Sequence, residues 1–212
     1  MQKIVLSLCD YTGVMLRPWV KAGYRCIAVD IQHEPGTTLR DGIEYVGADI
    51  FSYIPPNGDY AFVSAFPPCT HLAVSGARWF QSKGMGKLVE GLSLVERCRM
   101  LCEWAGAPYF LENPVSTLST YWRKPDYTFN PCDYGGYIRG GGDAYTKKTC
   151  LWVGNGFIMP EFKPVEPTEG SKMHLLPPSV ERANLRSATP EGFAIAVFEA
   201  NELSRKELLL CG

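Results

Sequence analysis

The sequence predicts an α/β domain built on a mostly parallel, doubly wound sheet. Two observations carry this prediction. Compact apolar runs typical of buried strands occupy residues 3–9, 25–30 and 61–66. The first two runs enclose a turn at 10–13 and a helical pattern at 14–22. Strand, glycine turn, helix and strand in this order form the repeating unit of sheets with parallel strands.

The remaining elements follow from periodicity and from turn residues. The pattern predicts a short strand at 43–46, an amphipathic helix at 88–104, strands at 109–111 and 150–153, and a final helix at 192–210. Residues 32–42, 115–147 and 154–190 are rich in polar residues, glycine or proline, and we expect them to form loops.

Length and composition set the broad class. The chain has 212 residues, of which 46% are hydrophobic, so we expect one domain over 1–212 with an ample core. It contains no apolar run long enough to span a membrane, and its first residues do not resemble a signal peptide. We therefore expect a cytoplasmic protein.

The charge is unevenly distributed along the chain. The net charge of −1 predicts no strong overall attraction to nucleic acid. Residues 71–150, however, carry 10 Lys and Arg against 7 Asp and Glu, a net charge of +3. This basic part follows Cys69 directly, and a solvated surface explains it as well as a binding role does.

The eight cysteines predict neither a disulfide framework nor a metal site. They are scattered along the chain, without CxxC spacing and without histidines at ligand spacing. Most therefore act as small buried hydrophobes, as Cys98 and Cys102 do on the expected core face of a helix.

Cys69 differs from the others in its setting. The apolar run at 61–66 stops at Pro67-Pro68, because proline cannot continue a strand within a sheet. Cys69 therefore lies at the carboxyl end of a strand, where open α/β sheets place their ligand sites. A second strand, at 109–111, runs into Glu112-Asn113-Pro114. A thiolate and an acid at neighbouring strand ends can attack and protonate an electron-poor ring, although a buried structural thiol also fits Cys69.

The first strand–helix–strand unit indicates a nucleotide-type cofactor site. Gly13 lies in the turn after the first strand, and Asp30 ends the second strand. Such an acid accepts hydrogen bonds from ribose hydroxyl groups, but it can equally be an ordinary residue at a strand end.

These motifs together resemble the cytosine-C5 methyltransferases that use S-adenosylmethionine, and especially the short members found in bacteriophages and prophages. Pro67-Pro68-Cys69 is similar to the nucleophile motif of that family, and Glu112-Asn113-Pro114 is similar to its Glu-Asn-Val motif. Residues 8–13 lie where the family has its cofactor loop. The resemblance covers nearly the whole chain and implies a Rossmann-like class I methyltransferase fold in a bacterial host cell.

The resemblance also implies roles for individual residues. Cys69 would attack C6 of cytosine, Glu112 would act on N3, and Asn113 would position the two loops. The implied cofactor-binding residues are Leu8, Cys9, Asp10, Tyr11, Thr12, Gly13, Asp30, Ile31, Asp49, Ile50 and Pro67. The candidate substrate-binding residues are Pro68, Thr70, His71, Arg78, Lys147 and Lys148.

The substrate stays open at this level. DNA, single- or double-stranded, is the family default. Residues 155–188, however, form only a short, loop-rich insert in place of a target-recognition domain. A free cytosine nucleotide such as dCMP or dCTP is therefore an alternative substrate. A non-catalytic binding or inhibitor protein with this fold is a further alternative, and an amino-group methyltransferase would carry an aromatic residue in place of Cys69.

Overall fold

The computed structural model describes residues 2–172, 177, 179 and 182–210, and it confirms the predicted α/β fold. Seven strands form one sheet in the order β3-β2-β1-β4-β5-β7-β6. Their bounds are β1 Ile4–Leu8, β2 Arg25–Arg40, β3 Ile43–Gly47, β4 Tyr60–Ala65, β5 Tyr109–Pro114, β6 Tyr127–Phe129 and β7 Thr149–Gly154. The order reverses between β1 and β4, and crevices for ligands form at such switch points.

The last three strands of the sheet identify its type. β7 pairs antiparallel with both β5 and β6, so β6 runs in the same direction as β5. A parallel sheet with one antiparallel strand inserted before its last strand is the arrangement of class I methyltransferases. The loop predicted at 115–147 therefore needs correction, because it contains β6, the short helix α3 (Leu118–Tyr121) and the 3₁₀ helix η3 (Pro131–Tyr137).

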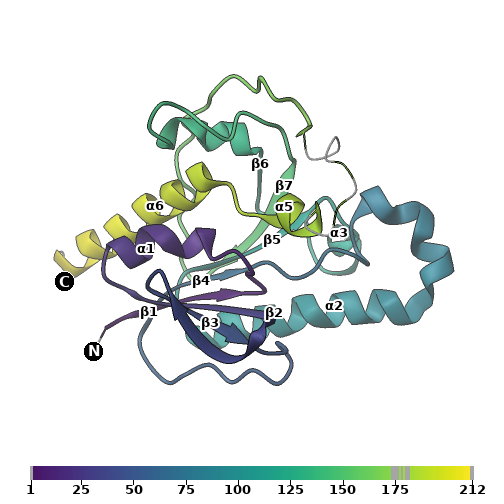
Figure 1. The fold of residues 1–212 in the computed structure, drawn as a ribbon, viewed down its shortest axis with the longest axis horizontal. Helices are drawn as coiled ribbons and strands as arrows, with labels where there is room; N and C mark the ends of the chain where they lie inside the picture. Colours follow the sequence, from purple (N-terminus) through teal and green to yellow (C-terminus); the bar gives the residue numbers. More distant parts are fainter. Residues whose placement is uncertain (1, 173–176, 178, 180–181, 211–212) are drawn as a thin grey trace.

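Helices cover both faces of the sheet (Figure 1). On one face lie the 3₁₀ helix η1 (Val14–Leu16), α1 (Arg17–Lys21) and α6 (Glu191–Leu210), packed on a core that includes Trp19, Phe62 and Phe193. On the other face lies α2 (Phe80–Ala105), whose buried side chains pack with Leu6 and Leu8. Because both faces are covered, every residue of β1 and β4 is buried, which explains their continuous apolar runs.

The helix predictions hold with shifted ends. The stretch predicted at 14–22 divides into η1 and α1, and the helix predicted at 88–104 begins already at Phe80. It is interrupted at Gly84, whose φ of 75° and ψ of 174° are not helical. The 3₁₀ helix η2 (Val74–Trp79) precedes it, and α5 (Arg182–Ser187) lies in the stretch predicted to be irregular. None of the helices in the described part of the chain is long and apolar enough to cross a membrane.

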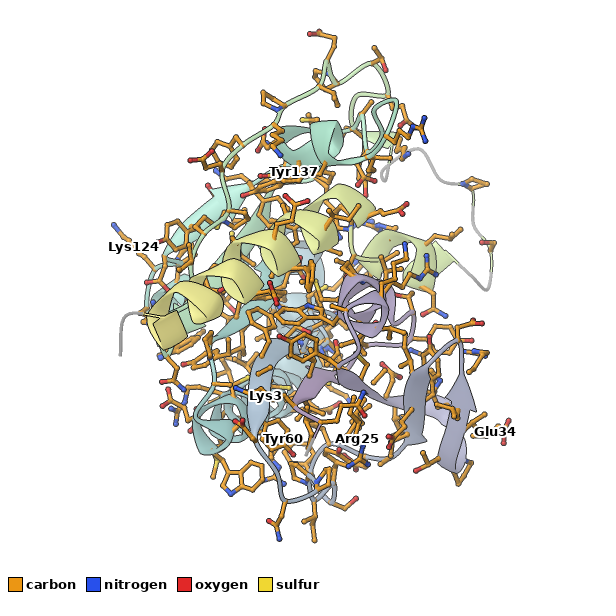
Figure 2. The ribbon with its side chains drawn as sticks, turned by 90° about the vertical axis from the view of Figure 1, so that its left-hand side faces the viewer. Lys3, Arg25, Glu34, Tyr60, Lys124 and Tyr137 are labelled. Carbon is orange, nitrogen blue, oxygen red and sulfur yellow. The ribbon has the colours of Figure 1, made fainter. Side chains whose placement is uncertain are left out.

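The prediction of a loop at 32–42 is wrong. After Asp30 the chain turns back, and residues 37–40 pair with β3 in descending order, from Val46 to Ile43. Asp41 and Gly42 connect the two segments with φ angles of 51° and 78°. Two positive φ angles in an Asp-Gly pair are typical of a tight hairpin turn, and this dipeptide was the missed signal. Figure 2 shows Glu34 on this hairpin, at the outer edge of the molecule.

The expected insert at 155–188 packs in part against η3. The Gly136 amide donates to the Lys163 carbonyl at 2.8 Å, and the Val165 amide donates to the Cys132 carbonyl at 2.9 Å. Residues 173–176, 178 and 180–181 of the expected insert lie outside the described residues. The single-domain assignment for 1–212 remains a prediction.

Substitution of Gly42 tests the hairpin. A left-handed φ costs an alanine about 1–2 kcal/mol, so both Gly42→Ala and the control Gly23→Ala, with a φ of 85°, should lower the free energy of unfolding by about that amount. A Cβ at residue 42 would also lie 2.6 Å from Val20 Cγ1, whereas one at residue 23 meets no atom within 4 Å. Gly42→Ala should therefore lose about 1 kcal/mol more in urea unfolding. Equal losses would contradict this packing.

Candidate active site

The carboxyl ends of β4 and β5 bring Cys69 and Glu112 to the same edge of the sheet. The pairing between these strands ends at Ala65 and Leu111. Beyond that point β4 stops at the prolines, while β5 continues and pairs only with β7. Glu112 therefore has no neighbouring strand on the side where the Cys69 loop leaves the sheet. The Glu112 carboxylate also affects the pKa of the Cys69 thiol, so the two charges lie within electrostatic reach of each other.

Hydrogen bonds join the loops that follow the two strands. Asn113, which is 1% exposed, donates from Nδ2 to the Pro67 carbonyl at 2.9 Å. The Thr117 amide donates to the Leu72 carbonyl at 3.0 Å, and the Val74 amide donates to the Val115 carbonyl at 3.0 Å. These contacts agree with the positioning role expected of Asn113, because they fix the Cys69 loop relative to Glu112.

Charged groups around Cys69 shift the pKa of its thiol in opposite directions. Burial raises the pKa of the Cys69 thiol, and the Glu112 carboxylate raises it further, whereas Lys147 and Arg186 lower it. Burial also raises the pKa of Glu112, and Lys147 again opposes the shift. The carboxyl group is thus held closer to its protonated form, in which it can donate a proton.

A narrow cleft lies beside Glu112. Its walls come from the end of β4, from β5, β6 and β7, and from the start of α6, with Phe66, Glu112, Phe129, Lys147, Thr149 and Ser187 among the lining residues. Lys147 is half-buried and lines the cleft, whereas Lys148 is exposed and does not. The structure therefore separates the two lysines that the sequence treated as a pair.

Arg186 is a charged residue near the site that the sequence did not indicate. It lies in α5, directly before Ser187 of the cleft wall, and its charge lowers the pKa of Cys69. The only available signal was its position shortly before the predicted final helix, in a stretch without periodicity.

The loop after β1 is organised by Asp10. Its Oδ1 accepts hydrogen bonds from the Gly13 amide at 2.8 Å and from the Thr12 amide at 3.0 Å, and its Oδ2 accepts one from Ser7 Oγ at 2.7 Å. Burial raises the pKa of Asp10, and these bonds oppose the shift. Asp10 therefore shapes the loop from within and is buried, at 4% exposure.

Gly13 is required in this loop by its conformation and by its surroundings. Its φ is 64°, and a Cβ there would lie 2.5 Å from the hydroxyl oxygen of Tyr45. Cys9, at the start of the same loop, also takes a positive φ, of 55°. Cys9 Sγ lies 3.8 Å from Cys98 Sγ, and this contact together with burial raises the pKa of Cys9.

Asp30 is the last residue of the parallel part of β2, where it pairs with Gly47. It is 9% exposed, and both of its hydrogen bonds to described residues, from the amide and the side chain of Gln32, use Oδ1. Its Oδ2 therefore remains available to a diol.

The other predicted cofactor residues differ in their exposure to solvent. Leu8, Ile50 and Pro67 are buried, whereas Ile31 is 71% exposed. Tyr11 stacks on His33, with ring centroids 5.2 Å apart. Asp49 is exposed, and its Oδ1 accepts a hydrogen bond from the Phe51 amide.

Several predicted substrate residues lie outside the cleft. His71 Nε2 is 3.8 Å from a Glu90 carboxylate oxygen. Arg78 is exposed, and its guanidinium lies 5.1 Å from the Trp79 ring centroid. Pro68 and Thr70 are exposed, and the Thr70 carbonyl accepts a hydrogen bond from Lys83 Nζ. No cluster of potential metal ligands occurs among the residues that the structure describes.

Comparison with known proteins finds likeness in structure and not in sequence. No protein-family model matches the chain, and no curated protein matches it. One solved structure with some similarity is described as that of a candidate DNA modification methyltransferase encoded within a prophage of E. coli. The TM-score is 0.43 at 13% sequence identity, and the match covers 78% of this chain and 53% of that one. The chain thus spans about half the length of that protein, and the fold assignment rests on the strand order instead.

Substitution of Lys147 tests the electrostatics of the site. Alkylation of Cys69 proceeds through the thiolate, so its rate rises with pH around the pKa of the thiol. Lys147→Gln removes a charge that lowers this pKa, and the midpoint should move to higher pH, whereas Lys147→Arg should leave it nearly unchanged. Mass spectrometry of iodoacetamide-treated protein separates Cys69 from the other cysteines. An unchanged midpoint in Lys147→Gln would contradict the arrangement.

Proposed function

We propose that this chain is an S-adenosylmethionine-dependent methyltransferase that acts on C5 of cytosine, by default in DNA, through a covalent bond to Cys69. The observation that carries the proposal is the meeting of Cys69 and Glu112 at diverging strand ends, with the Pro67 carbonyl held by Asn113. A thiol and an acid with a raised pKa, close enough for the carboxylate to raise the pKa of the thiol, are the two groups that addition to a pyrimidine ring requires.

The proposed roles account for each bond and proton. Cys69 Sγ forms a bond to C6 while Glu112 donates a proton to N3, so the electron pair of the C5–C6 double bond becomes available at C5. After C5 has been methylated, a base from the solvent takes the C5 proton and the Cys69 thiolate leaves C6, which restores the double bond. The N3 proton returns to Glu112. Because the thiol pKa is raised, Cys69 needs Lys147 and Arg186 to favour its thiolate.

The loop after β1 and Asp30 of β2 fit the cofactor. Bound S-adenosylmethionine would supply an electrophilic methyl group. Asp30 Oδ2 is available to ribose hydroxyls, and the loop shaped by Asp10 and Gly13 lets the backbone approach closely. We assign the cofactor to Leu8–Gly13, Asp30, Ile31, Asp49, Ile50 and Pro67 on this basis.

Methyl transfer to cytosine tests the proposal. Purified protein with radiolabelled S-adenosylmethionine should label a cytosine-containing DNA, duplex or single-stranded. Cys69→Ser should abolish the labelling, and Glu112→Gln should lower it by about 10²–10⁴-fold, since it removes the proton donor. Cys132→Ser, a change at a buried cysteine that is not part of the cleft, is the control and should retain activity.

The same assay separates the alternatives. Label in dCMP or dCTP alone would replace DNA by a free nucleotide as the substrate. Label on the exocyclic amino nitrogen, or no label in any cytosine substrate, would contradict the proposed chemistry.

A further inference from the structure

A second hollow, separate from the cleft beside Glu112, lies behind the Cys69 loop. It is a cavity of about 330 Å³ between that loop, the start of α2 and α3, and it shares no lining residue with the cleft. The residues that line it include His71, Phe80, Lys83, Lys87, Thr117 and Tyr121. This volume lies in the range of sites that bind small molecules.

The break at Gly84 shapes the cavity. Residues on both sides of the break line it, from Phe80 to Leu88. Gly84 has a φ of 75° and a ψ of 174°, a conformation that costs other residues about 1–3 kcal/mol, and a Cβ there would meet nothing within 4 Å. Glycine is therefore needed at this position for its backbone conformation and not for close packing.

Two buried polar atoms belong to the residues that line the cavity. His71 Nδ1 and Thr117 Oγ1 are inaccessible to solvent and have no hydrogen-bond partner among the residues that the structure describes. Buried polar atoms are normally paired, and leaving one unpaired costs about 1–3 kcal/mol. A polar ligand that reached these two atoms would remove this cost.

The remaining walls supply aromatic rings and positive charge. Phe80 is half-buried, and Tyr121 is 57% exposed although it lines the cavity. Lys83 Nζ donates to the Thr70 carbonyl at 2.7 Å, and Lys87 Nζ contacts a Glu90 oxygen at 2.6 Å. Each ammonium group has three donors, so both retain hydrogens for an anion.

We infer that this cavity binds a nucleotide unit, with its base against the aromatic walls and its phosphate at the lysines. A flat heteroaromatic ring with hydrogen-bonding edges matches Tyr121, Phe80 and the two unpaired polar atoms. A phosphate matches Lys83 and Lys87. The inference goes beyond the proposed reaction, because binding here requires neither Cys69 nor methyl transfer.

Occupation of the cavity would act on the Cys69 loop. Lys83 holds the Thr70 carbonyl, and the amides of Leu72 and Ala73 both donate to the Cys69 carbonyl at 2.9 Å. A nucleotide beside His71 thus contacts the same short segment that carries the thiol. The nucleotide is either a neighbour of the target base in one strand or a free molecule, and its chemistry is the same in both cases.

Photo-crosslinking tests this site. The probes are 4-thiothymidine 5′-monophosphate and a five-nucleotide single strand that carries 4-thiothymidine next to cytosine, each applied to the full chain carrying Cys69→Ala. We expect crosslinks within residues 71–88 or 117–121. Tyr121→Ala and Lys83→Gln should each weaken probe binding by about ten-fold, whereas the controls Tyr127→Ala and Lys21→Gln, on exposed residues outside the cavity, should not.

The two probes distinguish the sources of the nucleotide. Crosslinks in the cavity with the monophosphate identify a site for free nucleotides, and crosslinks there with the single strand alone identify a site for a neighbour of the target base. Crosslinks only outside these residues, or equal affinity of the wild type and Tyr121→Ala, would overturn the inference. All variants use the Cys69→Ala chain, so loss of methyl transfer does not affect the result.

Discussion

The candidate site depends on one buried hydrogen bond, from Asn113 Nδ2 to the Pro67 carbonyl. β4 and β5 separate at their carboxyl ends, and proline leaves β4 without a backbone donor there. The Asn113 side chain, which bonds to the Pro67 carbonyl at 2.9 Å, replaces the missing sheet contact. It thereby holds the Cys69 loop on the side of the sheet where Glu112 lies. Removing a partner from such a buried bond costs about 1–3 kcal/mol, which is a large share of the stability of a loop.

The position of the thiol also sets its chemistry. Burial and the Glu112 carboxylate raise the pKa of the Cys69 thiol, whereas Lys147, a backbone hydrogen bond and Arg186 lower it. These two cations come from segments far apart in the sequence, before β7 and in α5. The site is therefore complete only when the sheet and the C-terminal helices have packed together. A nucleotide in the cavity behind the loop would also act on Cys69, through the loop that carries it.

The sequence predicted those parts of the protein that depend on local pattern. The strand–helix–strand unit and the two strands that stop at prolines were found, since each rests on apolar runs and turn residues within a few positions. The hairpin after Asp30 was missed because its strands are polar at the sheet edge, although Asp41-Gly42 indicated the turn. Arg186 and the separation of Lys147 from Lys148 were not predictable, because side-chain direction and long-range packing decide them.

The central claim is that Cys69 forms a bond to C6 of cytosine, and trapping tests it most directly. With 5-fluorocytosine in the substrate and S-adenosylmethionine present, fluorine replaces the proton that must leave C5, so elimination cannot follow. Mass spectrometry should then find the substrate attached to the peptide that contains Cys69, and no adduct in Cys69→Ser. If the folded protein forms no adduct with 5-fluorocytosine, either in DNA or in free nucleotides, the result contradicts the account.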